Sequence, residues 1–197
     1  MRKILTLVLG VAGLAAAGAA SAQVFSEKEA RAMLFPEKGI GIAISKAGFL
    51  SDQDRKLLEE VAKTQNYYAA VAVPPDEGMF SNAAASAANF HRMEDAEVAA
   101  LATCNDRRNG GAPCEVVLRV YPKGWKPQPL QLSRDATEGF RKEYRRARAP
   151  KAMAISPKTG EWSVFRGDGA QNFAVSNCNG KSTRKGAADC LIVIKDD

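Results

Sequence analysis

Two stretches of the chain repeat one pattern of turn, helix and cysteine residues, and this repetition constrains the fold more than any other feature. Ala72–Ser81 and Ala154–Ser163 lie 82 positions apart and share Ala, Pro, Gly and Ser at matching places. In each, Pro-x-x-Gly separates two apolar runs. Proline presets φ and glycine accepts a positive φ, so each stretch predicts a β-hairpin. The expected strands are Tyr68–Val73, Met79–Asn82, Lys151–Ile155 and Glu161–Phe165.

An alanine-lined helix that ends in cysteine is predicted after each hairpin. The matching residues recur at i, i+4, i+5 and i+8, which places them on one helical face. They are Ala96, Ala100, Leu101 and Cys104 in the first copy and Ala170, Ala174, Val175 and Cys178 in the second. A second cysteine, Cys114 or Cys190, then begins an apolar strand. The repeated unit is therefore hairpin, helix, cysteine loop and strand, over residues 67–120 and 150–197.

The repeated unit predicts an α+β fold. One copy alone would bury little apolar surface, so we expect the two hairpin–helix–strand repeats to share an antiparallel-type sheet with both helices on one face. Residues 121–149 would link the copies through a helix at Arg134–Arg148, which ends before Pro150. Residues 23–66 are expected to be an N-terminal helical segment. Its helices would be Ser26–Leu34 and Asp52–Thr64, the second with an N-cap serine and acidic first-turn residues.

Residues 1–22 predict a cleavable signal peptide. Arg2 and Lys3 precede the apolar run Ile4–Ala17, and Ala20 and Ala22 supply the small-residue cleavage pattern. The leucine-rich part of the run is short against the roughly 20 strongly apolar residues of a spanning helix. No later segment of the sequence is as apolar. We therefore expect a periplasmic or secreted protein with no transmembrane anchor after cleavage.

All four cysteines follow the predicted cleavage point, where an oxidising compartment favours disulfides. Four cysteines allow three pairings. The equivalent positions of the cysteines in the two copies favour one disulfide inside each copy, Cys104–Cys114 and Cys178–Cys190, and pairing between copies is the alternative. The close cysteine spacing of a zinc site does not occur, so no metal is expected.

The combination of apolar strand, Pro-x-x-Gly turn, alanine-rich helix ending in Cys and a second Cys before a strand resembles a family of exported bacterial domains of unknown function. The resemblance covers Tyr67–Val120 and Pro150–Asp197. Its motifs are structural, so it implies no catalytic residues. Some similar chains carry an automatic label of 5-aminolevulinate synthase. The sequence does not support that label, because that enzyme is much larger and holds pyridoxal phosphate on a lysine, and no cofactor is expected here.

His91 is the one histidine of the chain, and it lies in the part of the first copy that the second copy lacks. No nucleophile elbow, zinc-protease, phosphate-loop or calcium-loop motif is present. A small periplasmic hydrolase that uses His91 is therefore the alternative function. The leading hypothesis is a disulfide-stabilised binding or envelope-accessory module of unknown ligand, and a purely structural role is a third.

The predicted linker helix carries the one patterned group of charges. Arg141, Arg145 and Arg148 project in nearly the same direction on a helix that continues through all three, and arginine suits carboxylates and phosphates. We expect them to bind an anionic envelope component or an acidic protein. The net charge of +6 includes Arg2 and Lys3 and is too mild to indicate nucleic acid. An ordinary solvated helix face is the alternative for these arginines.

Overall fold

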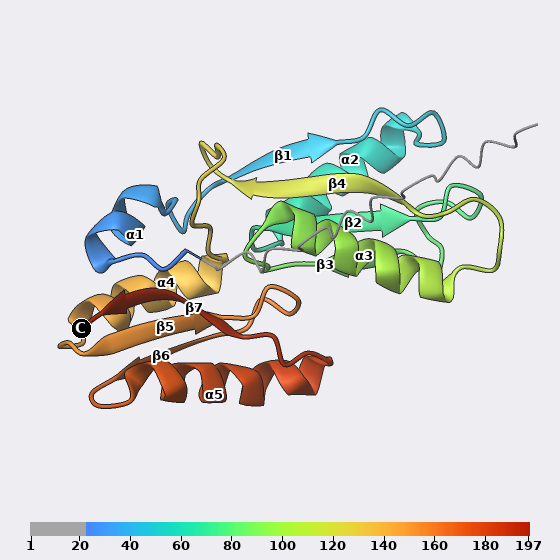
Figure 1. Cartoon of the computed structure of the whole chain (residues 1–197). Helices are drawn as coiled ribbons and strands as arrows, with labels where there is room; N and C mark the ends of the chain where they lie inside the picture. The colour runs from blue at the N-terminus through green and yellow to red at the C-terminus, as the bar shows by residue number, and fades with distance from the viewer. Residues whose placement is uncertain (1–22) are drawn as a thin grey trace, which may run out of the picture.

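A computed structural model describes residues 23–197 (Figure 1). The predicted signal peptide lies outside these residues. The chain is α+β, as predicted, and its strands form two separate antiparallel sheets. None of the helices in the described part of the chain has the length and apolar character needed to cross a membrane.

The first sheet has the strand order β1-β4-β2-β3 and lies between two helices (Figure 1). Ala70 and Ala72 of β2 pack with helix α3, whereas Ala69 and Val71 pack with helix α2, because successive side chains of a strand point to opposite faces. The elements are β1 (Ile40–Ile44), α2 (Asp52–Lys63), β2 (Ala69–Val73), β3 (Ala85–Ala87), α3 (Met93–Arg107) and β4 (Glu115–Pro122).

The second sheet has the order β6-β5-β7 and is also covered on both faces. Ala152 and Ala154 of β5 pack with helix α5, and Met153 and Ile155 pack with helix α4. Helix α1 (Glu27–Met33) contacts β7. The remaining elements are α4 (Arg134–Lys142), η1 (Tyr144–Arg146), β5 (Lys151–Ile155), β6 (Trp162–Arg166), α5 (Ala170–Ser182), η2 (Thr183–Lys185) and β7 (Leu191–Asp196).

Both predicted N-terminal helices are present, and each begins at a capping box. The Ser26 and Ser51 hydroxyls accept hydrogen bonds from the backbone N–H groups of Glu29 and Asp54, whose carboxylates accept from the serine N–H groups in return. Residues 23–66 are nevertheless not only helical, contrary to the prediction. Strand β1 pairs along the outer edge of β4, and its neighbour lies some 80 residues further along the chain.

The two sheets have irregularities at matching places. The register between β2 and β4 shifts between Val71 and Ala72, and the register between β5 and β7 shifts between Met153 and Ala154, 82 positions later. A duplicated unit would produce this agreement. The duplication itself stays a prediction, which superposition of the two units would test.

The prediction that both copies share one sheet is wrong. The strands of the two copies lie in separate sheets, and among residues 23–197 no strand of one copy pairs with a strand of the other. β1 occupies the outer edge of β4. Phe25 occupies that of β7, where its N–H donates to Val193 O and its C=O accepts from Lys195 N–H, each at 2.9 Å. The outer edges of β4 and β7 are therefore both occupied by segments that precede the first copy.

The second strand of the first hairpin is also displaced from its predicted position. Met79–Asn82 forms turns instead, in which Ser81 N–H donates to Gly78 O and Ala84 N–H donates to Ser81 O. Phe80 is 84% exposed, so it does not pack as its counterpart Trp162 does. The strand that pairs with β2 is β3, a few residues later.

The linker helix ends earlier than predicted, at Lys142, and a 3₁₀ turn follows. The buried Lys151 accounts for this change, because its ammonium donates to Tyr144 O at 3.2 Å and also lies over the Tyr144 ring. Its charge is compensated by Glu27 at 2.6 Å. The Tyr144 carbonyl is thereby held toward the sheet, and no α-helix continues through Arg145 and Arg148.

Gly139 allows α4 to lie directly on the indole ring of Trp162. A Cβ at this glycine would come within 2.1 Å of the ring. We expect Gly139→Ala to lower the free energy of unfolding by about 1–3 kcal/mol, since overpacking forces neighbours apart. Denaturant unfolding would measure this. Gly180→Ala in α5, where nothing lies within 4 Å, is the matched control and should be neutral or stabilising. Equal effects of the two substitutions would contradict the packing argument.

Candidate functional site

Both predicted disulfides are present, Cys104–Cys114 and Cys178–Cys190. Each joins the helix over a sheet to the strand that follows. In both units an asparagine comes directly after the first cysteine, and its side-chain oxygen accepts the backbone N–H of the second. Asn105 and Asn179 make these bonds at 3.0 Å. The Cys-Asn pair is a sequence signal that the predicted repeat did not include.

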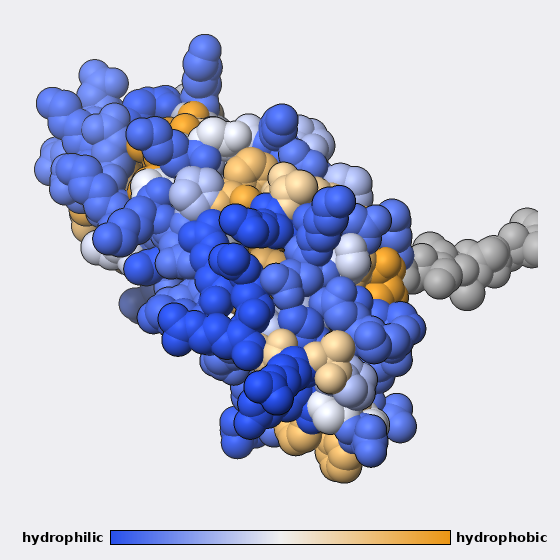
Figure 2. All heavy atoms as spheres, turned by 90° about the vertical axis from the view of Figure 1, so that its left-hand side faces the viewer, coloured by the Kyte–Doolittle hydropathy of each residue, from blue (hydrophilic) through white to orange (hydrophobic). Residues whose placement is uncertain are grey.

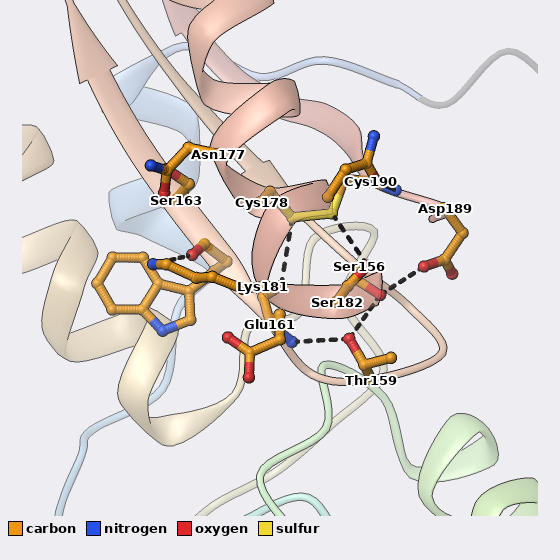
Figure 3. Close-up of a disulfide and its surroundings, with 12 residues drawn as sticks. Ser156, Thr159, Glu161, Ser163, Asn177, Cys178, Lys181, Ser182, Asp189 and Cys190 are labelled. Carbon is orange, nitrogen blue, oxygen red and sulfur yellow. Dashed lines mark hydrogen bonds between the residues drawn. A yellow bond between two sulfur atoms is a disulfide. The ribbon is translucent and has the colours of Figure 1, made fainter. Parts of the chain in front are cut away.

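A polar cluster surrounds the second disulfide (Figure 3). Ser156 donates its hydroxyl hydrogen to Asp189, and the Thr159 hydroxyl donates to Ser156 Oγ at 2.7 Å. The Glu161 N–H donates to Thr159 Oγ1 at 3.3 Å. Ser156 is fully buried. These bonds tie the β5–β6 turn to the residue before Cys190, so the cluster is structural, with the Ser156 hydroxyl already committed.

His91 joins the first unit to the linker and to the second unit. Its Nδ1 accepts the backbone N–H of Ser133 at 3.1 Å, which assigns the ring proton to Nε2, and Nε2 donates to Glu161 O at 3.1 Å. The side chain is 1% exposed. Burial lowers the pKa of His91 to about 4, against the opposing effect of the Glu161 carbonyl. Both ring nitrogens are occupied, so neither is free to take a proton from a substrate.

A cleft of about 500 Å³ lies at the junction of the two units. Most of its lining is apolar and includes Phe25, Leu130 and Leu191. Arg92 and Asp95, at the start of α3, supply the charged groups, and burial raises the pKa of the Asp95 carboxyl. The cleft could take a small, mainly apolar group. It brings His91 near a carboxylate, but the hydrogen bonds of His91 hold its ring within the protein.

Two of the three arginines predicted to bind anions are held by contacts within the chain. Arg141 Nη1 lies 2.9 Å from Glu37 Oε1, and its Nη2 donates to Phe35 O at 3.1 Å. Arg145 Nε lies 3.7 Å from Glu27 Oε1. Arg148 is exposed and has no carboxylate oxygen within 4.0 Å among residues 23–197. The structure therefore does not gather the three side chains on one outward helix face.

Arg148 instead lines a hollow with two other arginines. This arginine hollow, of about 570 Å³, is formed by Arg146, Arg148, Ala149, Arg166 and Gly167. The three arginines are exposed, and in the described part of the chain none has a carboxylate oxygen within 4.0 Å. Figure 2 shows the end of the molecule where β5 begins, β6 ends and the C-terminus lies. Strongly hydrophilic side chains gather across this face.

Arg146 and Arg166 are not among the predicted anion-binding residues, for separate reasons. Arg146 joins the hollow only because the α-helix gives way to η1 before it. Arg166 comes from β6, where it is paired with Lys151, the first residue of β5. The predicted hairpin could have indicated Arg166, because its register places the end of β6 beside the segment that follows the linker helix.

No family model, curated protein or solved structure matches the chain.

Proposed function

We propose that this chain is an exported, disulfide-stabilised binding module that holds an anionic envelope component in the arginine hollow. The observation that carries the proposal is the meeting of Arg146, Arg148 and Arg166 at one hollow without a carboxylate partner in residues 23–197. A charge that only keeps a protein soluble needs no such convergence. Three guanidinium groups around one depression are suited to an anion that enters it.

Arginine fits this role through its shape as well as its charge. The planar guanidinium donates two parallel hydrogen bonds to a carboxylate or phosphate, and it is more weakly hydrated than an ammonium. A single exposed ion pair contributes only about 0–1 kcal/mol. The three arginines must therefore act together, and binding should weaken as salt shortens the Debye length from about 10 Å at 0.1 M.

Export and an envelope location belong to the same proposal. Two disulfides with no free cysteine among residues 23–197 suit an oxidising compartment. The predicted signal peptide and the resemblance to exported domains support the same location. A periplasmic or secreted module would meet anionic lipid head groups, acidic glycans and acidic protein surfaces.

The test replaces Arg146, Arg148 and Arg166 together by Gln. We expect the affinity for anionic partners to fall about tenfold or more, because three exposed contacts of roughly 0.5 kcal/mol each are lost. The melting temperature should stay nearly unchanged, since all three side chains are exposed. Binding would be measured by fluorescence anisotropy on labelled polyglutamate and by sedimentation with phosphatidylglycerol vesicles.

The matched control removes the same charge from another surface. Lys56, Arg107 and Lys126 are exposed and lie outside the second unit, so their triple Gln variant changes the net charge equally. It should bind as the parent does. If the two triple variants lose the same affinity, or if neither loses any, the arginine hollow is not the site.

A further inference from the structure

Strand β6 has an open outer edge beside the arginine hollow. It is an end strand of its sheet and pairs only with β5. Glu161 O accepts from Ser156 N–H at 2.8 Å, and Gly167 N–H donates to Pro150 O at 2.7 Å. Residues 161 and 167 therefore direct their backbone groups toward the β5 side. The backbone N–H and C=O groups of successive residues in a strand point to alternate sides. Those of Val164 and Arg166 therefore point away from β5.

The outward backbone groups differ along β6. Trp162 O accepts from Lys181 Nζ at 2.9 Å, which closes that end of the edge. For Val164 and Arg166, no side chain or loop of residues 23–197 makes a hydrogen bond to the backbone N–H or C=O. An end strand with such groups is a template on which another extended chain can pair.

A second hollow follows this open part of the edge. It has a volume of about 260 Å³ and is lined by Glu143, Arg146, Ala147, Val164, Phe165 and Arg166. Arg146 and Arg166 line this hollow and the arginine hollow alike. Phe165 is 38% exposed and stacks on Phe173, which is 54% exposed. Open backbone groups, apolar side chains and guanidinium groups therefore all lie along the outer edge of β6.

We propose that the partner of the arginine hollow is an extended acidic polypeptide segment that adds to the sheet along the outer edge of β6. The inference rests on the proposed function and names the class of its partner. The backbone of the segment would pair with Val164 and Arg166. Its acidic side chains would meet the guanidinium groups of Arg146, Arg148 and Arg166, and its alternate, apolar side chains would contact Phe165 on the opposite face of the sheet.

The edge favours a polypeptide over a lipid head group or a glycan. Only a polypeptide carries N–H and C=O groups at the repeat of a β-strand, and those are the groups that Val164 and Arg166 leave open. Strand addition draws affinity from the main chain and specificity from alternate side chains. Arginines at the edge also repel a second copy of β6, which would bring like charges together.

The experiment compares two peptides on the intact, disulfide-bonded protein. The first is an eight-residue peptide of alternating glutamate and valine with a fluorescent label. The second has the same sequence with every peptide nitrogen methylated, so its charge is kept but its backbone donors are lost. We expect the methylated peptide to bind at least about tenfold more weakly. The triple Gln variant of Arg146, Arg148 and Arg166 should lose affinity for the first peptide to a similar degree.

A second variant tests the edge from the side of the protein. Val164→Pro removes the outward N–H of residue 164 and leaves the β5 pairing intact, since proline is tolerated at the open side of an edge strand. Val164→Pro should lower the affinity for the unmodified peptide about tenfold and leave the affinity for the methylated peptide unchanged. Its melting temperature is compared with that of the parent, and the peptide pair decides the question if the variant does not fold.

The outcomes distinguish strand addition on β6 from the anion binding that the proposed function requires. Equal, arginine-dependent binding of both peptides would overturn strand addition and leave an anion site. Arginine-dependent binding of phosphatidylglycerol vesicles without binding of the peptide would do the same. If no anionic probe binds in an arginine-dependent way, the proposed function fails together with the inference.

Discussion

Removal of the Cys178–Cys190 disulfide is expected to lower the free energy of unfolding by about 3 kcal/mol. The bond closes a loop with a sequence separation of 12, and the chain-entropy model gives this magnitude for loops of such length. Its loss would free the end of α5 from β7, the last strand of a three-stranded sheet. Guanidinium unfolding of the variant Cys178→Ala with Cys190→Ala would measure the change.

The first unit supplies the comparison for this prediction. The Cys104–Cys114 bond has a sequence separation of 10, and Asn105 caps it as Asn179 caps the other. Its removal should cost a similar free energy. A loss below about 1 kcal/mol in both double variants would mean that the helices are held by packing alone.

Lowering the pH from 6.5 to 4 is expected to destabilise the protein through His91 by about 3 kcal/mol. Burial lowers the pKa of this ring to about 4 in the folded chain, whereas an exposed histidine in the unfolded chain titrates near 6.5. Between these values the unfolded chain binds the proton and the folded chain does not. Stability contributed by the neutral ring is therefore complete above pH 6.5 and falls as the pH decreases toward 4.

Denaturant unfolding at several pH values would measure this loss, and His91→Gln isolates it from other groups. Glutamine cannot take up the proton, and its amide can still hydrogen-bond. Carboxylates such as Glu29 and Asp54, whose pKa values are lowered by their capping serines, lose stabilisation at lower pH in both proteins. The difference in the free energy of unfolding between the parent and His91→Gln should therefore shrink as the pH is lowered from 6.5 to 4. A constant difference would show that His91 does not titrate in this window.

Local patterns predicted most of the elements of this fold. The alanine positions of α3 and α5, the capping serine of α2 and the paired cysteines each depend on residues close in the chain, so spacing alone reveals them. The pairing of β1 with β4 does not, because the two strands lie far apart in sequence. The same holds for Phe25, whose bonds to Val193 and Lys195 close the edge of β7. These pairings join residues far apart in the chain, so spacing within each copy does not reveal which segments occupy the outer edges of β4 and β7.

The sequence predicted that arginines form the candidate site, but it did not predict which arginines come together. Arginines near the linker were identified, yet their grouping assumed one continuous helix. The buried Lys151 draws in the carbonyl of Tyr144 and redirects the chain, and acidic residues of the N-terminal segment pair with Arg141 and Arg145. These are tertiary contacts that no helical wheel contains. Arg148 alone belongs to both the predicted set and the arginine hollow.

The most direct test of the arginine hollow follows the side-chain Nε–Hε signals of all arginines by NMR while the acidic peptide is added. Binding in the hollow predicts that the signals of Arg146, Arg148 and Arg166 shift together and saturate with one affinity. The signals of Arg107 in the first unit and of Arg141 in its pair with Glu37 should remain in place. Shifts spread evenly over the exposed arginines, or confined to arginines outside the hollow, would contradict the account.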